Sequence, residues 1–122
     1  MNYRTQKQRN EAIQILANIK SAITQIEIIN LSASQLATLA NQATEPTVKE
    51  VLFGRYSEYY DTSSIITENI TDVLDEMNTD IIDERESFKE DTLNATTQFL
   101  DWAYLEIDEL RNRISKITQD MK

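Results

Sequence analysis

The rarity of residues that interrupt helices constrains this chain more than any other feature. Its 122 residues include one proline, Pro46, one glycine, Gly54, and neither cysteine nor histidine. Glycine and proline are the usual breaks between helices, so the sequence predicts long α-helices. Cysteine and histidine carry much of the metal binding and nucleophilic catalysis in proteins. Their absence argues against most enzymes and against metal sites built on these ligands.

Charge is distributed unevenly along the chain. Residues 1–44 carry four basic and two acidic side chains, whereas residues 45–122 carry eight basic and 19 acidic ones, which gives a net charge of −9. Nucleic acid is not an expected partner, because phosphates require a basic surface. Segment 21–44 has one charge, Glu27, but polar residues interrupt it repeatedly. We therefore expect protein neighbours around it and no transmembrane segment.

The start of the chain is basic, and no apolar run follows it. A secretory signal peptide requires such a run directly after its basic residues. We therefore expect a protein that is cytoplasmic or is exported without a cleavable signal peptide.

The first helix is expected over about residues 3–43 and carries an apolar stripe in alternating steps of three and four residues. This spacing is typical of coiled-coil packing. The stripe consists of Ala12, Leu16, Ile19, Ile23, Ile26, Asn30, Ala33, Ala37 and Ala40. Other large apolar residues, such as Ile28 and Leu39, lie off the stripe. A helix that is apolar on more than one side needs two neighbours, which are either a third helix or a second chain.

The clearest turn lies at residues 41–47, because Pro46 cannot continue the preceding helix. Thr47 and Glu50 then have the spacing of a capping box, so a second helix is expected over about 47–80. Gly54, inside this helix, predicts a close helix crossing or a short bend. The expected stripe ends near Asp80. It consists of Tyr56, Tyr59, Ser63, Ile66, Ile70, Val73 and Met77.

A third helix is expected over about 84–120. Its stripe consists of Phe88, Thr92, Ala95, Phe99, Ala103, Ile107, Leu110, Ile114, Ile117 and Met121. Residues 1–122 are therefore interpreted as one all-α domain of long antiparallel helices with coiled-coil-like packing. Two architectures fit: a three-helix bundle, which is slightly favoured, or an extended helical hairpin in which the last two segments form one continuous arm.

Carboxylates are the only abundant ionisable groups that could form a site. Between Glu58 and Glu109, 16 acidic residues face only two basic ones. A carboxylate-bridged di-iron bundle needs histidines, and a calcium-binding EF-hand loop needs a glycine at its centre; the acidic segment contains neither. We expect no catalytic residue, no cofactor and no metal, and we interpret the acids as a solvated face.

Aromatic residues provide better binding candidates. One cluster consists of Phe53, Tyr56, Tyr59 and Tyr60. It is either a recognition patch or, in the simpler interpretation, a cap on the core made by Tyr56 and Tyr59 with Tyr60 on the flank. On the third helix, Trp102 and Tyr104 flank the stripe, and exposed aromatics of this kind are common binding residues.

Two short motifs resemble the small helical proteins of bacterial type VII secretion, the WXG family and its LXG-associated partners. Leu52-Phe53-Gly54 lies near the first turn, where that family has a Trp-x-Gly motif or a variant; here Leu52 replaces the tryptophan. Tyr104-Leu105-Glu106-Ile107-Asp108 matches the family's Tyr-x-x-x-Asp/Glu export signal. The resemblance implies a non-enzymatic dimerising partner or targeting factor for a secreted protein.

The sequence thus predicts a helical protein–protein interaction module that binds copies of itself or another helical protein. The candidate protein-binding residues are Leu52, Gly54, Trp102, Tyr104 and Asp108. The alternative is an acidic inhibitor or decoy, encoded by a phage or mobile element, that binds a basic protein surface.

Overall fold

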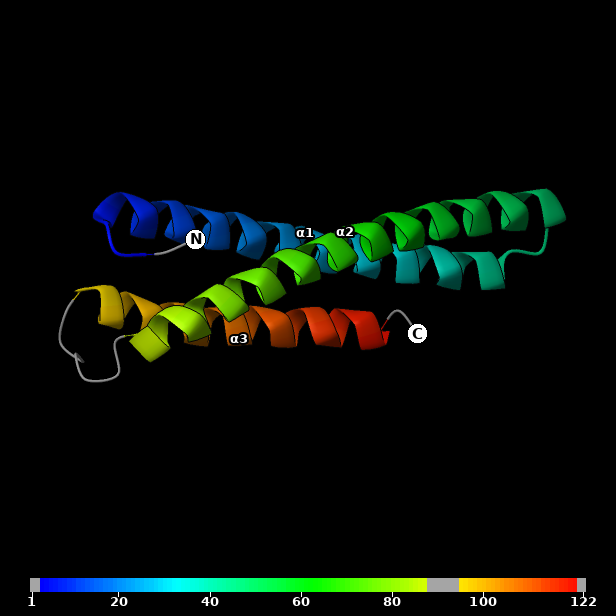
Figure 1. Cartoon of the computed structure of the whole chain (residues 1–122). Helices are drawn as coiled ribbons and strands as arrows, with labels where there is room; N and C mark the ends of the chain where they lie inside the picture. Colours follow the sequence, from blue (N-terminus) through cyan, green and yellow to red (C-terminus); the bar gives the residue numbers. More distant parts are fainter. Residues whose placement is uncertain (1–2, 88–94, 121–122) are drawn as a thin grey trace.

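The computed structural model describes residues 3–87 and 95–120, which contain three α-helices and no β-strand. The helices are α1 (Gln6–Gln42), α2 (Pro46–Ser87) and α3 (Ala95–Asp120). The first two form a long antiparallel hairpin, and α3 packs along one half of it (Figure 1). The all-α prediction is confirmed. Because α2 and α3 lie against one another, they are not one continuous arm.

α1 begins later than predicted, because Thr5 caps its first turn. The Thr5 hydroxyl accepts a hydrogen bond from the backbone N–H of Gln8 at 3.1 Å, and the Thr5 N–H donates to the Gln8 side chain at 3.0 Å. This is a capping box. The predicted α1 stripe is largely confirmed. Its buried members are Ala12, Leu16, Ile19, Ile23, Ile26, Ala33 and Ala40.

α2 starts one residue before the predicted position and ends later. Pro46 is its first residue, where the missing N–H of proline costs no helical hydrogen bond. The backbone N–H of Lys49 donates to the carbonyl of Glu45 at 3.1 Å. Thr47 therefore lies inside the helix, and the capping box predicted there was wrong. α2 continues past Asp80 to Ser87, so the predicted end was also wrong.

The buried face of α2 differs in phase from the predicted stripe. Its buried residues are Ser63, Thr67, Ile70, Leu74, Met77 and Ile81. Tyr59 and Val73, predicted to be in the core, are exposed. The correct stripe includes the fully buried Ile81, one turn beyond Met77. This burial explains why the helix continues through its acidic last third.

α3 buries the predicted stripe from Phe99 to Ile117. It also buries Thr96, Thr97 and Leu100, whereas Ala95 is exposed. The predicted start at residue 84 was wrong, since residues 84–87 belong to α2. Phe88, Thr92 and Met121 lie outside the described residues.

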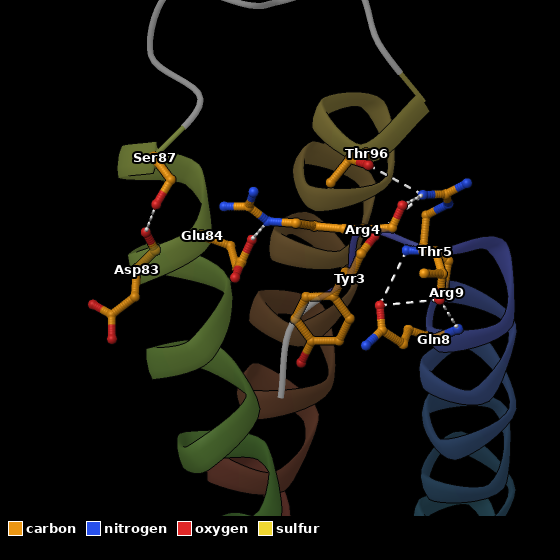
Figure 2. Close-up of polar contacts among 9 residues, drawn as sticks. All are labelled: Tyr3, Arg4, Thr5, Gln8, Arg9, Asp83, Glu84, Ser87 and Thr96. Carbon is orange, nitrogen blue, oxygen red and sulfur yellow. Dashed lines mark hydrogen bonds and ion pairs between the residues drawn. The ribbon is translucent and has the colours of Figure 1, made fainter.

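A short N-terminal segment closes the end of the bundle where α1 begins. Tyr3 is fully buried, and Figure 2 shows its ring in the space between α2 and α1. This ring lies 5.3 Å from that of Phe99 on α3. The Arg9 guanidinium donates to the Tyr3 carbonyl at 3.2 Å and to the Thr96 hydroxyl at 3.1 Å. Residues from all three helices therefore meet around Tyr3.

Candidate protein-interaction surface

The far half of the α1–α2 hairpin lacks a core of its own. We call residues 28–62 the hairpin tip and the remaining described residues the base. Within the tip, the only buried residues are Ala33 and Ala40. The tip also holds large apolar and tyrosine side chains that are half-buried or exposed. They are Ile28, Ile29, Leu31, Leu36, Leu39, Val48, Val51, Leu52, Phe53, Tyr56, Tyr59 and Tyr60.

The tip lacks a core because α3 stops short of it (Figure 1). Ion pairs fix the direction of α3: Arg85 pairs with Asp101 at 3.0 Å, and Asp75 pairs with Arg111 at 3.2 Å, so α3 runs antiparallel to α2. It ends at Asp120. The first turns of α2 and the last turns of α1 thus have one helical neighbour each.

A groove of about 630 Å³ opens where α3 ends. Its floor and walls come from α1 and α2, and the last turns of α3 close one end. The lining residues are Glu27, Asn30, Leu31, Ala33, Ser34, Ala37, Tyr56, Tyr60, Arg113, Lys116, Ile117 and Asp120. Its charged lining residues lie at the end closed by α3, whereas those in the tip are uncharged. A concave, uncharged surface beside exposed apolar side chains is typical of a protein-binding site.

The two walls of the groove in the tip differ in side-chain size. On the α1 side, Ser34 and Ala37 are small, and the neighbouring Leu31 is 62% exposed. On the α2 side, the rings of Tyr56 and Tyr60 lie 6.3 Å apart. Phe53 precedes Tyr56 by three residues and therefore lies on the same side of the helix. The groove thus has a small-residue wall and an aromatic wall.

Charge is concentrated in the base. Residues 28–44 contain no charged side chain, and the whole tip contains four acidic and two basic ones. By contrast, ion pairs in the base link helices or join the N-terminal segment to α2. They are Arg4–Glu84 at 3.7 Å, Arg85–Asp101, Arg111–Asp75, and Arg113–Glu27 at the border with the tip. Several carboxylates of the acidic segment therefore contact arginines.

Near the border between the tip and the base, three buried side-chain polar atoms have no hydrogen-bond partner among the described residues. They are Nδ2 of Asn30, Oγ of Ser63 and Oγ1 of Thr67. A buried polar group without a partner costs about 1–3 kcal/mol of stability. Two of them, on Ser63 and Thr67, lie within the first turn or so of the base. The α1–α2 packing is thus weakened close to where the support of α3 ends.

The candidate residues Leu52 and Gly54 lie in the tip, on α2. Leu52 is half-buried, and Gly54 is exposed. A Cβ atom added at Gly54 would meet no atom within 4 Å. The predicted close helix crossing at Gly54 was therefore wrong for contacts within this chain, and α2 is helical on both sides of it.

The other candidates, Trp102, Tyr104 and Asp108, are exposed on α3 in the base. Trp102 lies beside the ring of Phe99, with the ring centroids 5.9 Å apart. The Arg85 guanidinium lies 5.0 Å from the centre of the Tyr104 ring, a cation–π distance. Tyr104 and Asp108 are one turn apart and share a face of α3. The candidates thus form two separate groups, one in the tip and one in the base.

The aromatic cluster departs from the simpler interpretation. Tyr59 is exposed, so it does not cap the core. Tyr56 and Tyr60 both line the groove. The groove residues of α1, Leu31, Ser34 and Ala37, were absent from the candidates. The sequence feature that could have indicated them is the charge-free run of residues 28–44. This run forms a groove wall only because α3 ends beside it.

Residues 3–87 and 95–120 contain neither a candidate metal site nor a candidate membrane span. No three histidine, cysteine, aspartate or glutamate side chains gather there in a way that could hold a metal ion. Over the same ranges, none of the helices combines the length and hydropathy that a membrane span requires. Comparison with protein-family models, curated proteins and solved structures gave no match to this chain.

Proposed function

We propose that this chain is a non-enzymatic interaction module whose base presents the hairpin tip to another helical polypeptide. One observation carries the proposal: within residues 28–62 only two alanines are buried, although the tip is rich in large apolar side chains. Helices in proteins derive most of their stability from packing of an apolar face. The tip lacks this packing within its own chain, and a docked helix would supply it.

The groove supports a helical rather than an extended partner. It lies where a third helix would continue the three-helix packing of the base, between α1 and α2. An amphipathic helix that lays its apolar face into such a groove is a common mode of recognition. An extended peptide would pair with a sheet edge, and the described residues contain no strand.

The experiment is site-specific photo-crosslinking in the cells that encode the protein. A photoreactive amino acid replaces Leu31 in the tip or, as the matched control, Leu105 in the base. These leucines are similarly exposed, at 62% and 67%. We expect covalent adducts to a polypeptide from position 31 and none from position 105. Adducts from neither position, or from position 105 alone, would contradict a docking role for the tip.

A second candidate function is that of a partner or targeting factor for a type VII secreted protein. Tyr104 and Asp108, the two ends of the export-like motif, are exposed on one face of α3 and would be accessible to a secretion apparatus. Export of a tagged chain from a host with a type VII system tests this role. We expect Tyr104→Ala to abolish export and Leu105→Ala to leave it unchanged. Equal export of both variants would refute the motif.

A further inference from the structure

We propose that the partner of the hairpin tip is a second copy of this chain, bound about a two-fold axis so that two tips form a four-helix arrangement. This inference rests on the proposed function, since it identifies the occupant of the same groove. A two-fold contact is isologous: if residue i of the first copy meets residue j of the second, then residue j of the first also meets residue i of the second. The tip must therefore be complementary to itself.

The two walls of the groove meet this requirement. Under a two-fold axis, the small-residue wall of one copy lies against the aromatic wall of the other. Ser34 and Ala37 leave space on α1, and Tyr56 and Tyr60 supply bulk on α2. Large side chains that fit against small ones give the interdigitated packing of four-helix bundles. Each copy would also cover the exposed Leu31 of the other.

The charge distribution points to the tip as the place where two copies can meet. Each chain carries a net charge of −9, so contact through the acidic base would bring like charges together. The tip has a net charge of only −2, and its α1 half has no charge. Charges on the two bases are screened over about 8 Å at physiological ionic strength, a short distance compared with the length of these helices.

The exposed surface is large enough for a stable dimer. The chain exposes 8013 Å², whereas a compact monomer of its mass exposes about 6,700 Å². The excess of about 1,300 Å² is larger than the ~800 Å² that each partner buries in an interface of standard size. This excess is summed over the whole chain, and burial of an area of this size on each copy would bring the exposed area close to that of a compact globular protein.

Disulfide crosslinking tests the predicted contact directly, because the chain has no cysteine and each introduced thiol is unique. Purified Ser34→Cys and Tyr60→Cys proteins are mixed and oxidised with a mild oxidant. We expect a crosslinked heterodimer between positions 34 and 60. The matched control mixes Ser34→Cys with Leu105→Cys and should give little of that product. Equal yields from both mixtures would overturn the geometry.

Sedimentation of uncrosslinked protein provides the second measurement. We expect the wild-type chain to dimerise at about 10 μM or below. Tyr60→Glu should raise the dissociation constant by about 100-fold or more, because it places a charge in the desolvated centre of the contact. Leu105→Glu is the control and should change it less than about threefold. Circular dichroism of both variants checks that the helices remain.

The outcomes separate this inference from the proposed function. If the wild-type chain stays monomeric at about 1 mM, the partner is not a second copy. The same conclusion follows if the Tyr60→Glu variant dimerises as well as the wild type. If cellular photo-crosslinks from position 31 then join a different polypeptide, the interaction module stands and only its partner changes. If position 31 gives no adducts either, both proposals fail.

Discussion

The base and the hairpin tip share two helices but differ in what stabilises them. In the base, three helices surround a core, and arginines cross to carboxylates on neighbouring elements. In the tip, the same α1 and α2 continue with one neighbour each, and the described ion pair, Arg55–Glu58, lies within α2. A long amphipathic helix therefore buries its apolar face only as far as its second neighbour extends.

This difference has a consequence for how each region responds to concentration. The base buries its apolar residues within one chain, so its stability should not depend on association. The tip buries little within the chain, so its stability should rise with the concentration of whatever covers it.

Two leucines on α1 give the most direct test. Leu16 in the base is 1% exposed, and Leu39 in the tip is 53% exposed. Leu16→Ala should reduce the free energy of unfolding by about 3 kcal/mol, because it removes buried contacts and leaves a cavity. Leu39→Ala should reduce it by less than about 0.5 kcal/mol. Urea unfolding at low protein concentration measures both, and similar losses would refute the distinction between the two regions.

The buried phenol of Tyr3 gives a pH dependence specific to the base. Burial and the charges of Asp80, Glu84 and Glu76 raise the pKa of Tyr3 from 10 to about 12, because they disfavour the phenolate. A pKa that is higher in the folded state means stability that is complete below pH 10 and is lost as the pH rises towards 12.

The substitution Tyr3→Phe isolates this contribution, because it keeps the ring against Phe99 and removes the ionisable hydroxyl. Below pH 10 the variant should be as stable as the wild type or more stable, since the Tyr3 hydroxyl has no hydrogen-bond partner among the described residues. Between pH 10 and 12 it should lose less stability than the wild type. Thermal unfolding across this range measures the difference, and parallel losses would contradict a raised pKa.

Sequence reasoning succeeded where local periodicity and packing coincide. The stripes of α1 and α3 could be assigned because their large apolar residues recur in one unambiguous phase. In α2, Val73 and Leu74 offer two adjacent phases, and only contact with both other helices decides that Leu74 is buried. The helix start at Pro46 was mislocated because the Thr47–Glu50 spacing resembled a cap.

The groove could not be predicted from the sequence, because it depends on tertiary register. The charge-free run of α1 and the aromatic cluster of α2 were each visible as separate patterns. Their joining at the end of α3 depends on where Asp120 lies along the hairpin. No local spacing encodes this position.

The buried hydroxyl of Ser63 offers a smaller test near the border of the two regions. It is fully buried and its Oγ has no partner among the described residues. Ser63→Ala should therefore increase the free energy of unfolding by about 1 kcal/mol. Ser64→Ala, at the exposed neighbouring position, controls for helix propensity and should gain less than about half as much. Urea unfolding compares the two, and a loss of stability in Ser63→Ala would show that the hydroxyl is used.

Substitution of Gly54 should have the smallest effect, and it tests whether the tip contacts a partner at this position. Its missing side chain costs helix stability, and an added Cβ would meet open space, so Gly54→Ala should stabilise the monomer by about 0.5–1 kcal/mol. Ser57→Ala, on an exposed position of the same helix, is the control and should gain less. If Gly54→Ala also weakens association, the partner's backbone must approach α2 at this position. The glycine would then serve the contact between chains, because nothing within one chain requires it.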